Sequence, residues 1–176
     1  MTILVRDGGV EDAEGVARAH VQGWRESYKD FLNAESLAGL SVEERFRMWS
    51  DILSRPDPTA KFLVAEDVDG TIVGFARGGA VREKGTTPLD TESELYAIYL
   101  IDRVKRQGIG RRLAIGVFDH LAQNFASAGL WVLEQNFSAR SFYEILGGRP
   151  TVEQRLELRG QTVTEIGYRF EPIPRS

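Results

Sequence analysis

The chain has 176 residues, 42% of them hydrophobic and 27% charged, which is the size and composition of one ordinary globular domain with its own hydrophobic core. It contains no cysteine, which excludes disulfides, thiolate metal sites and a cysteine nucleophile, and two histidines are too few to favour a zinc site, so we expect no metal. The net charge of −4 argues against nucleic acid as a partner, and no stretch approaches the roughly 20 apolar residues of a membrane span, so we expect a cytoplasmic protein.

The N-terminal part predicts one strand and two helices. Thr2–Arg6 is rich in residues that favour strands, and apolar residues recur at helical spacing from about 10 to 28. The motif SVEE at 41–44 matches a capping box, so a second helix should begin there and end before Pro56. The apolar face of this second helix would hold Val42, Phe46, Trp49 and Leu53.

The middle of the chain predicts a hairpin and then a central strand. Residues 61–67 and 71–81 are β-rich and flank Asp69–Gly70, a dipeptide typical of tight hairpin turns. Residues 92–101, with the sequence ESELYAIYLI, form a long apolar run that favours a strand inside a sheet.

The C-terminal part predicts two helices and three strands. A helix from about Gly108 to Ser127 carries an apolar stripe, and residues 130–134 form a short strand. Ser138 is a candidate N-cap for a helix that runs through Leu146. The tail at 151–171 holds two extended runs that predict a closing hairpin.

This order of elements predicts an α/β fold of mixed α+β character, with a single domain over residues 1–176 built around a mixed sheet. Strand 92–101, the following helix and strand 130–134 form a crossover connection. We therefore expect these two strands to lie parallel.

The basic loop Lys105–Arg111 (KRQGIGR) joins the central strand to the long helix. Its two glycines let the backbone pass close to a ligand, and the start of the helix offers free N–H groups and a positive dipole end. These features favour a phosphate or pyrophosphate, held in addition by Arg106 and Arg111. The alternative is an ordinary strand-to-helix turn with solvated arginines. The loop fits neither the dinucleotide fingerprint nor the phosphate loop of nucleotide-binding proteins.

Two further candidates lie downstream. Asn136 follows strand 130–134, where it could hydrogen-bond an extended ligand beside that strand, or simply cap a loop. Tyr143 lies inside the next helix, where it could act chemically or pack as an ordinary core aromatic residue.

Together these segments resemble the GNAT superfamily of N-acetyltransferases. ELYAIYLIDRVKRQGIGRRL (94–113) is similar to that family's strand and pyrophosphate loop, and NFSARSFYEILGG (136–148) is similar to its later Asn/Phe-Tyr segment. HVQGWRESYKDFL (20–32) and LSVEERFRMW (40–49) are similar to the two N-terminal helices of one bacterial branch. The chain departs from the pattern at Lys105, where the family usually has Gln or Arg, and at Gly148, where an aromatic residue is common.

The resemblance implies a GNAT-type acyl-CoA N-acyltransferase fold, with a mostly antiparallel mixed sheet flanked by helices. It implies acetyl-CoA as co-substrate and an amine as acceptor. Strand 92–101 would splay away from strand 130–134, and the pantetheine arm would fill the gap like an added strand. The expected contacts to coenzyme A come from Ile98, Tyr99, Leu100, Lys105, Arg106, Gln107, Gly108, Ile109, Gly110, Arg111, Asn136 and Tyr143.

The resemblance also implies roles in catalysis. The backbone N–H of Leu100 would polarise the thioester carbonyl, and Tyr143 would protonate the leaving thiolate as general acid. Glu94 is the first candidate for a water-relayed general base, the alternative being a solvated charge at the strand end. His20 is a second candidate base or a structural histidine. Trp24 and Tyr28 would line the acceptor side or serve as core residues.

Three functional hypotheses remain open from the sequence. The first is an N-acetyltransferase for a small-molecule or protein amine, by direct attack in a ternary complex. The second is a non-catalytic, CoA-binding regulatory module of the same fold, and the third is a nucleotide-binding protein that uses the same loop. The acceptor and the acyl group are not identified by the sequence. The C-terminal strands or the N-terminal helices could support a homodimer.

Overall fold

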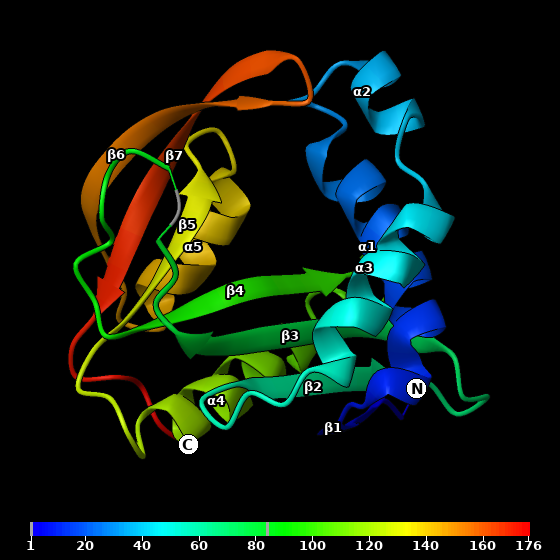
Figure 1. Cartoon of the computed structure of the whole chain (residues 1–176), viewed down its shortest axis with the longest axis horizontal. Coiled ribbons are helices and arrows are strands. Elements are labelled where there is room, and N and C mark those ends of the chain that lie inside the picture. The colour runs from blue at the N-terminus through cyan, green and yellow to red at the C-terminus, as the bar shows by residue number, and fades with distance from the viewer. Residues whose placement is uncertain (1, 84) are drawn as a thin grey trace.

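The computed structural model describes residues 2–83 and 85–176 and arranges them around one seven-stranded sheet (Figure 1). The strands lie in the order β1-β2-β3-β4-β5-β7-β6, and all neighbours are antiparallel except β4 and β5, which are parallel. Their bounds are β1 Leu4–Asp7, β2 Lys61–Glu66, β3 Ile72–Ala80, β4 Ser93–Leu100, β5 Ala128–Leu133, β6 Arg149–Leu158 and β7 Gln161–Phe170. The predicted mixed, mostly antiparallel sheet and its parallel crossover pair are confirmed.

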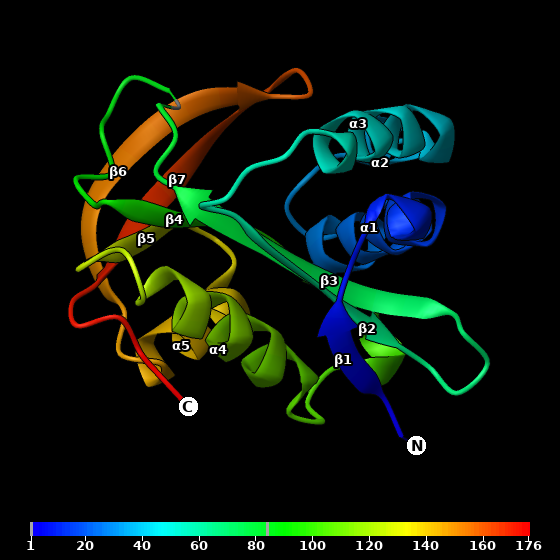
Figure 2. The same ribbon diagram turned by 60° about the horizontal axis from the view of Figure 1, so that its bottom comes forward.

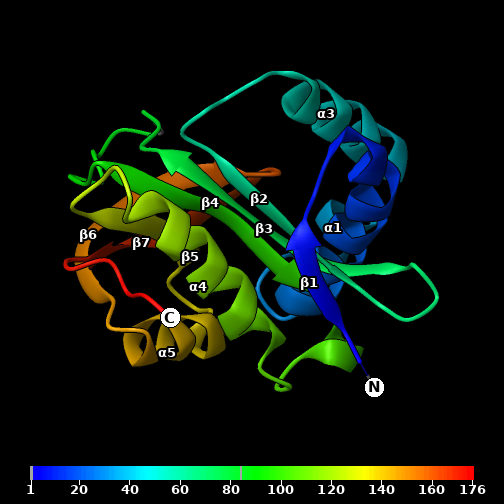
Figure 3. The same ribbon diagram turned by 90° about the horizontal axis from the view of Figure 1, so that it is seen from below.

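Helices cover both faces of the sheet (Figures 2 and 3). Helices α1, α2 and α3 lie on one side, and α4 and α5 lie on the other. Their bounds are α1 Ala13–Tyr28, α2 Ala34–Ala38, α3 Val42–Ser54, α4 Ile109–Leu121 and α5 Phe137–Ile145, with 3-10 turns at Val10–Asp12 and Asp102–Val104. Among the described residues, no helix is long and apolar enough to cross a membrane.

The second helix begins as its sequence predicts but differs on its apolar face. The Ser41 hydroxyl accepts a hydrogen bond from the backbone N–H of Glu44, so the predicted cap of α3 is present. Trp49 is buried as expected, whereas Phe46 is 41% exposed. The prediction for Phe46 was wrong because α3 packs against α1 and the sheet through Val42, Met48, Trp49, Ile52 and Leu53 instead. The short helix α2 was not predicted.

Two predicted helix ends need correction. Helix α4 ends at Leu121 and not at Ser127, because the residues after it turn back to bond the start of β4. Helix α5 begins at Phe137, and its N-cap is Asn136, whose side-chain oxygen accepts from the Ala139 N–H at 3.2 Å. The prediction of Ser138 as the N-cap was therefore wrong.

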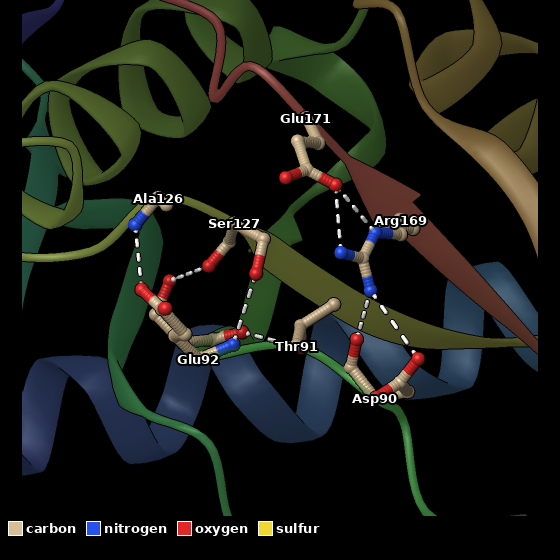
Figure 4. Close-up of polar contacts among 8 residues, drawn as sticks. Asp90, Thr91, Glu92, Ala126, Ser127, Arg169 and Glu171 are labelled. Carbon is tan, nitrogen blue, oxygen red and sulfur yellow. Dashed lines mark hydrogen bonds and ion pairs between the residues drawn. The ribbon is translucent and has the colours of Figure 1, made fainter.

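Strands β4 and β5 are held together at one end. The pairing between them is limited to Ser93 with Ala128 and Glu94 with Gly129. Figure 4 shows the polar contacts that close this end. The Ser93 N–H and hydroxyl both donate to the Ser127 carbonyl, at 3.1 and 2.9 Å, and the Glu92 carboxylate accepts from the Ala126 N–H at 2.6 Å. The strands are thus fastened where they begin.

Beyond this fastened end β4 diverges from β5. Its pairing with β3 shifts register, because Arg77 lies opposite Ala97 whereas Gly78 lies opposite Leu95. Tyr96 is thus the extra residue of a β-bulge, which bends and twists a strand. The predicted splaying of this strand is present and begins beside the bulge.

The hairpin of β6 and β7 arches over the splayed strands and reaches α2 (Figure 1). At its tip the Arg159 guanidinium donates to the Ser36 carbonyl at 2.8 Å, and the Ser36 hydroxyl donates to the Arg159 carbonyl at 2.9 Å. The backbone of Arg159 and of Gly160 has positive φ, at 49° and 80°, which forms the tight turn. This contact joins the C-terminal hairpin to the N-terminal helices.

Candidate functional site

The splayed half of β4 directs backbone groups into the gap that opens between β4 and β5. The Ile101 N–H donates to the Val73 carbonyl of β3 at 3.1 Å. Because successive residues of a strand direct their N–H and C=O groups to opposite sides, those of Leu100 and Ile98 face the β5 side. There the pairing with β5 has already ended. An extended ligand that carries amides could therefore bind along Ile98 and Leu100, as the sequence predicts.

The gap ends at the N-terminus of α4. Gly108 is the N-cap of α4, and its φ of 78° lies in the left-handed region, which favours glycine. The first N–H groups of the helix, from Ile109 to Arg111, have no intrahelical acceptor. Arg106 and Arg111 are exposed beside them. The arrangement suits an anion such as a pyrophosphate.

Other side chains of the loop point elsewhere. The Lys105 ammonium lies 2.6 Å from the Asp102 carboxylate and 3.2 Å from the Ser27 hydroxyl. The Gln107 amide donates to the Arg103 carbonyl at 2.9 Å. Lys105 and Gln107 could therefore contribute their backbone to a ligand in this conformation, whereas their side chains stabilise the loop. The predicted contacts of these residues remain predictions.

The close approach of Gly110 to β4 explains the second glycine of the loop. A Cβ at this position would lie 3.3 Å from Leu100 Cδ1 and 3.8 Å from the Phe142 ring. Gly110 thus lets α4, α5 and the end of β4 pack closely where the gap meets the loop.

Tyr143 comes from α5 and is 8% exposed. Its ring lies 5.3 Å from that of Phe142 and 6.2 Å from that of Tyr168. Among the described residues its hydroxyl has no hydrogen-bond partner. Burial, and to a smaller extent the nearby Tyr99, raise its pKa above the usual value for tyrosine. The hydroxyl therefore stays protonated at neutral pH, as a general acid requires.

A cluster of aromatic rings lies on the other side of β4. The hydroxyl groups of Tyr28 and Tyr99 are 3.3 Å apart, and the Trp24 ring meets that of Tyr28 edge-on at 4.9 Å. Tyr99 is stacked on His20 at 5.0 Å. Burial is the main cause that raises the pKa of both tyrosines. These contacts join α1 to β4 through the Tyr99 side chain. The backbone of Tyr99 lies opposite Phe75 and faces β3, so it does not share the orientation predicted for Ile98 and Leu100.

His20 has a structural partner. Its Nδ1 accepts from the Trp49 Nε1–H at 3.0 Å. Burial, with a smaller contribution from the Arg45 cation, lowers the pKa of His20 to about 3. The ring is neutral at physiological pH, and the nitrogen that could take a proton is already bonded. This geometry favours the structural interpretation over the general base.

Glu94 lies at the fastened end of β4 and is 2% exposed. Its carboxylate accepts from the Arg82 guanidinium at 2.7 and 3.2 Å and from the Arg82 backbone N–H at 3.1 Å. The same Arg82 guanidinium lies over the Tyr96 ring, 4.2 Å from its centroid, so Glu94 and Tyr96 share this cation. Glu94 is therefore not part of the cluster that contains Tyr99, and only a relay could connect it to an acceptor there. Its role as a base remains a prediction.

Asn136 caps α5 with its side-chain oxygen. Its amide N–H₂ group makes no hydrogen bond within the described residues, so that end is available to a ligand beside β5. The cap and the ligand contact predicted from the sequence are compatible, because they use different atoms.

Two charged residues near the tyrosine pair were not predicted. Glu165 of β7 lies opposite Leu133 of β5 and is 9% exposed, and its charge raises the pKa of Tyr28 and of Tyr99. Arg45 of α3 acts on Tyr99 in the opposite direction. Along β7, Glu165 shares one side of the strand with Gln161 and Arg169, while Ile166, Tyr168 and Phe170 take the other, so nothing in the sequence indicated that Glu165 would be buried. Nothing indicated Arg45 either, because a half-buried arginine in a helix looks like a solvated one.

A pocket of about 200 Å³ lies between the loop after α1 and the ends of β5 and β7. Its lining residues are Phe31, Leu133, Glu134, Gln135, Gln161, Thr162, Val163 and Thr164. Because this lining is mostly polar, the pocket is suited to a hydrated or charged group. No cluster of metal-ligating side chains occurs among the described residues.

Comparisons with known proteins agree with this geometry. Residues 21–147 match the Acetyltransferase (GNAT) family. The chain is 32% identical to the uncharacterized N-acetyltransferase YuaI of Bacillus subtilis, over 94% of this chain and 91% of the relative.

Two solved structures share the fold. One is the PaiA N-acetyltransferase of Thermoplasma acidophilum in complex with coenzyme A, with a TM-score of 0.74 and 19% identity over 97% of this chain and 99% of the other. The other is a phosphinothricin acetyltransferase of Sinorhizobium meliloti in complex with AcCoA, with a TM-score of 0.68 and 19% identity over 98% of this chain and 89% of the other.

Proposed function

This chain belongs to the GNAT family of acetyltransferases, and we propose that it transfers an acetyl group from acetyl-CoA to a primary amine by direct attack in a ternary complex. The observation that carries the proposal is the splaying of β4 from β5, which leaves the backbone of Ile98 and Leu100 facing a gap. That gap meets the start of α4, where Gly110 lies against Leu100 and against Phe142, the neighbour of Tyr143 in α5.

The residues present fit acetyl-CoA. The backbone of Ile98 and Leu100 would bond the amides of its pantetheine arm, and Asn136 would do so from the β5 side. The N–H groups from Ile109 to Arg111, with the charges of Arg106 and Arg111, would hold the pyrophosphate. The PaiA N-acetyltransferase holds coenzyme A and the phosphinothricin acetyltransferase holds AcCoA, both in the same fold, which supports this proposal.

The chemistry divides among few groups. The amine must first lose a proton, because an alkylammonium with a pKa of about 10 has no lone pair at neutral pH. Its nitrogen then attacks the thioester carbon, a C–N bond forms, and the C–S bond breaks. The Leu100 N–H would bond the carbonyl oxygen as negative charge develops on it. Tyr143 would give its proton to the departing thiolate, and the proton of the amine would pass through water to Glu94.

The alternative is a non-catalytic module that binds coenzyme A. The Tyr143 hydroxyl favours the enzyme, because it bonds no other described residue and is not among the fully enclosed unbonded atoms, so it is open to a ligand. The cytoplasm remains our proposed location.

Incubation of the purified protein with acetyl-CoA and a panel of primary amines tests the proposal. Thiol release would be corrected for hydrolysis, and N-acetylated products would be identified by mass spectrometry. Amine-dependent release with the matching product supports the enzyme. Tight binding of coenzyme A without any acetylated product would instead support the non-catalytic module.

A further inference from the structure

Arg45 has an unusual environment for an arginine. It is half-buried in the first turns of α3 and makes no ion pair with a carboxylate in the part of the chain that the structure describes. Its contacts are the Met48 sulfur at 3.5 Å and the face of the Trp24 ring at 5.7 Å. A guanidinium taken partly out of water ordinarily finds an oxygen acceptor. Arg45 lacks one.

Neighbouring arginines of the same helix behave differently. Arg47 pairs with Glu43, and Arg55 pairs with Asp51 at 2.7 Å, although both arginines are largely exposed. Exposed pairs of this kind contribute little to stability. The solvent-facing arginines of the helix thus form ion pairs, whereas Glu44 acts on Arg45 only through its charge and forms no ion pair with it among the described residues.

Arg45 faces the acceptor side of the proposed active site. Its cation lies over Trp24, and the Trp24 ring lies 6.4 Å from that of Tyr99. Arg159 at the hairpin tip is close enough to lower the pKa of Arg45, after the larger effect of burial. Two cations, Arg45 of α3 and Arg159 of the hairpin, are therefore close to each other beside the aromatic cluster.

We propose that Arg45 binds an anionic group of the acceptor, so that the acceptor is a primary amine that also carries a carboxylate. This inference rests on the proposed acetyltransferase function. The planar guanidinium can bind a carboxylate through two parallel hydrogen bonds, and the rings of Trp24 and Tyr99 provide apolar surface for the carbon skeleton. The amino group would extend toward the gap between β4 and β5. Polyamines, which bring only positive charge, would be disfavoured.

Matched pairs of acceptors test the inference. Each pair compares an amino acid with the amine that lacks its carboxylate: phenylalanine with phenylethylamine, methionine with 3-(methylthio)propylamine, and 4-aminobutanoate with propylamine. Spermidine serves as the polyamine. The kcat/KM of the wild-type enzyme and of Arg45→Gln and Arg45→Lys would be measured at saturating acetyl-CoA. Arg47→Gln is the control, because it removes a cation from the same helix at an exposed position.

We expect the wild-type enzyme to prefer the carboxylated member of at least one pair by tenfold or more. Arg45→Gln should lower kcat/KM for that member at least tenfold and leave its partner amine within about twofold. Arg45→Lys should restore part of the preference, and Arg47→Gln should change nothing. A wild-type preference for the amine without a carboxylate or for spermidine, or an equal loss on both members in Arg45→Gln, would overturn the inference while the acetyltransferase function stands. Failure to acetylate any amine would contradict the proposed function itself.

Discussion

The hydroxyl groups of Tyr28 and Tyr99 lie 3.3 Å apart, although the residues are 71 positions apart in the chain. Burial is the largest cause that raises the pKa of each, so both remain protonated at neutral pH. One hydroxyl donates to the other, and the second proton is left for a further acceptor atom. The pair is therefore placed to bond a polar group of a ligand on the α1 side of β4.

Tyr99→Phe should raise the KM for the amine about fivefold, because a neutral hydrogen bond contributes about 1 kcal/mol. The affinity for coenzyme A should not change, since the backbone of Tyr99 faces β3 and its side chain lies on the α1 side of β4. Steady-state kinetics and calorimetric titration separate the two effects. Tyr96→Phe is the matched control, because its hydroxyl bonds the Ala80 carbonyl away from this pair. Equal changes in both variants would contradict a ligand contact at Tyr99.

Tyr143→Phe should lower kcat about a hundredfold, within the range for loss of a general acid. The free energy of unfolding should stay nearly constant, because the hydroxyl has no partner among the described residues. Coenzyme A affinity should also be unchanged. Kinetics, chemical denaturation and titration with coenzyme A give the three quantities. A kcat within twofold of the wild-type value would reject the acid role.

Glu94→Gln tests the base. Glutamine can still accept from Arg82 through its carbonyl oxygen, so the fold should be retained. If Glu94 takes the proton of the amine, kcat/KM should fall at least tenfold at pH 7. The loss should shrink toward pH 9.5, where a growing fraction of the amine is already deprotonated. A loss that is constant across this pH range would indicate a structural role, and unchanged kinetics would remove Glu94 from the mechanism.

The elements and the ligand loop could be predicted because their patterns are local. Strand β4 shows in ESELYAIYLI, and the two glycines of the loop show where the backbone must turn. The boundary of α5 was missed because Asn136 and Ser138 are both good N-cap residues. The N-cap is Asn136, whose backbone N–H bonds the Leu133 carbonyl at the end of β5.

The site beyond the loop depends on contacts between residues far apart in sequence. Nothing in the local pattern indicates that Arg45 lies over Trp24, or that Glu165 of β7 acts on Tyr99. The place where β4 leaves β5 is likewise set by the bulge at Tyr96. The apolar run from Leu95 to Ile101 reads the same in sequence with or without one extra residue.

Gly108→Ala should weaken coenzyme A binding through backbone strain alone. A Cβ at Gly108 would meet no atom within 4 Å, but the φ of 78° costs a residue with a Cβ about 1–2 kcal/mol. We expect an affinity at least fivefold lower and a lower melting temperature. Gly70→Ala is the control, because its φ of 83° imposes the same strain and its Cβ would also meet no atom within 4 Å, but it lies in the turn between β2 and β3. An equal loss of coenzyme A affinity in the two variants would contradict a local effect at the loop.

His20 should make the fold sensitive to mild acid. Its pKa in the folded chain is lowered to about 3, chiefly by burial, whereas the unfolded value is about 6.5. Below pH 6.5 the unfolded chain binds a proton at His20 that the folded chain does not. The free energy of unfolding should therefore decrease as the pH falls below 6.5, by at most about 1.4 kcal/mol per pH unit.

His20→Gln should reduce this slope between pH 7 and pH 5, because glutamine can accept from Trp49 and does not titrate. Urea denaturation of the wild-type protein and of the variant at several pH values measures the difference. The window stays above the range in which carboxylates such as Asp12, whose pKa is lowered chiefly by its bond to Arg6, contribute. His120→Gln controls for the other histidine. If the wild-type protein and His20→Gln lose stability in parallel down to pH 5, the buried histidine does not carry the acid sensitivity.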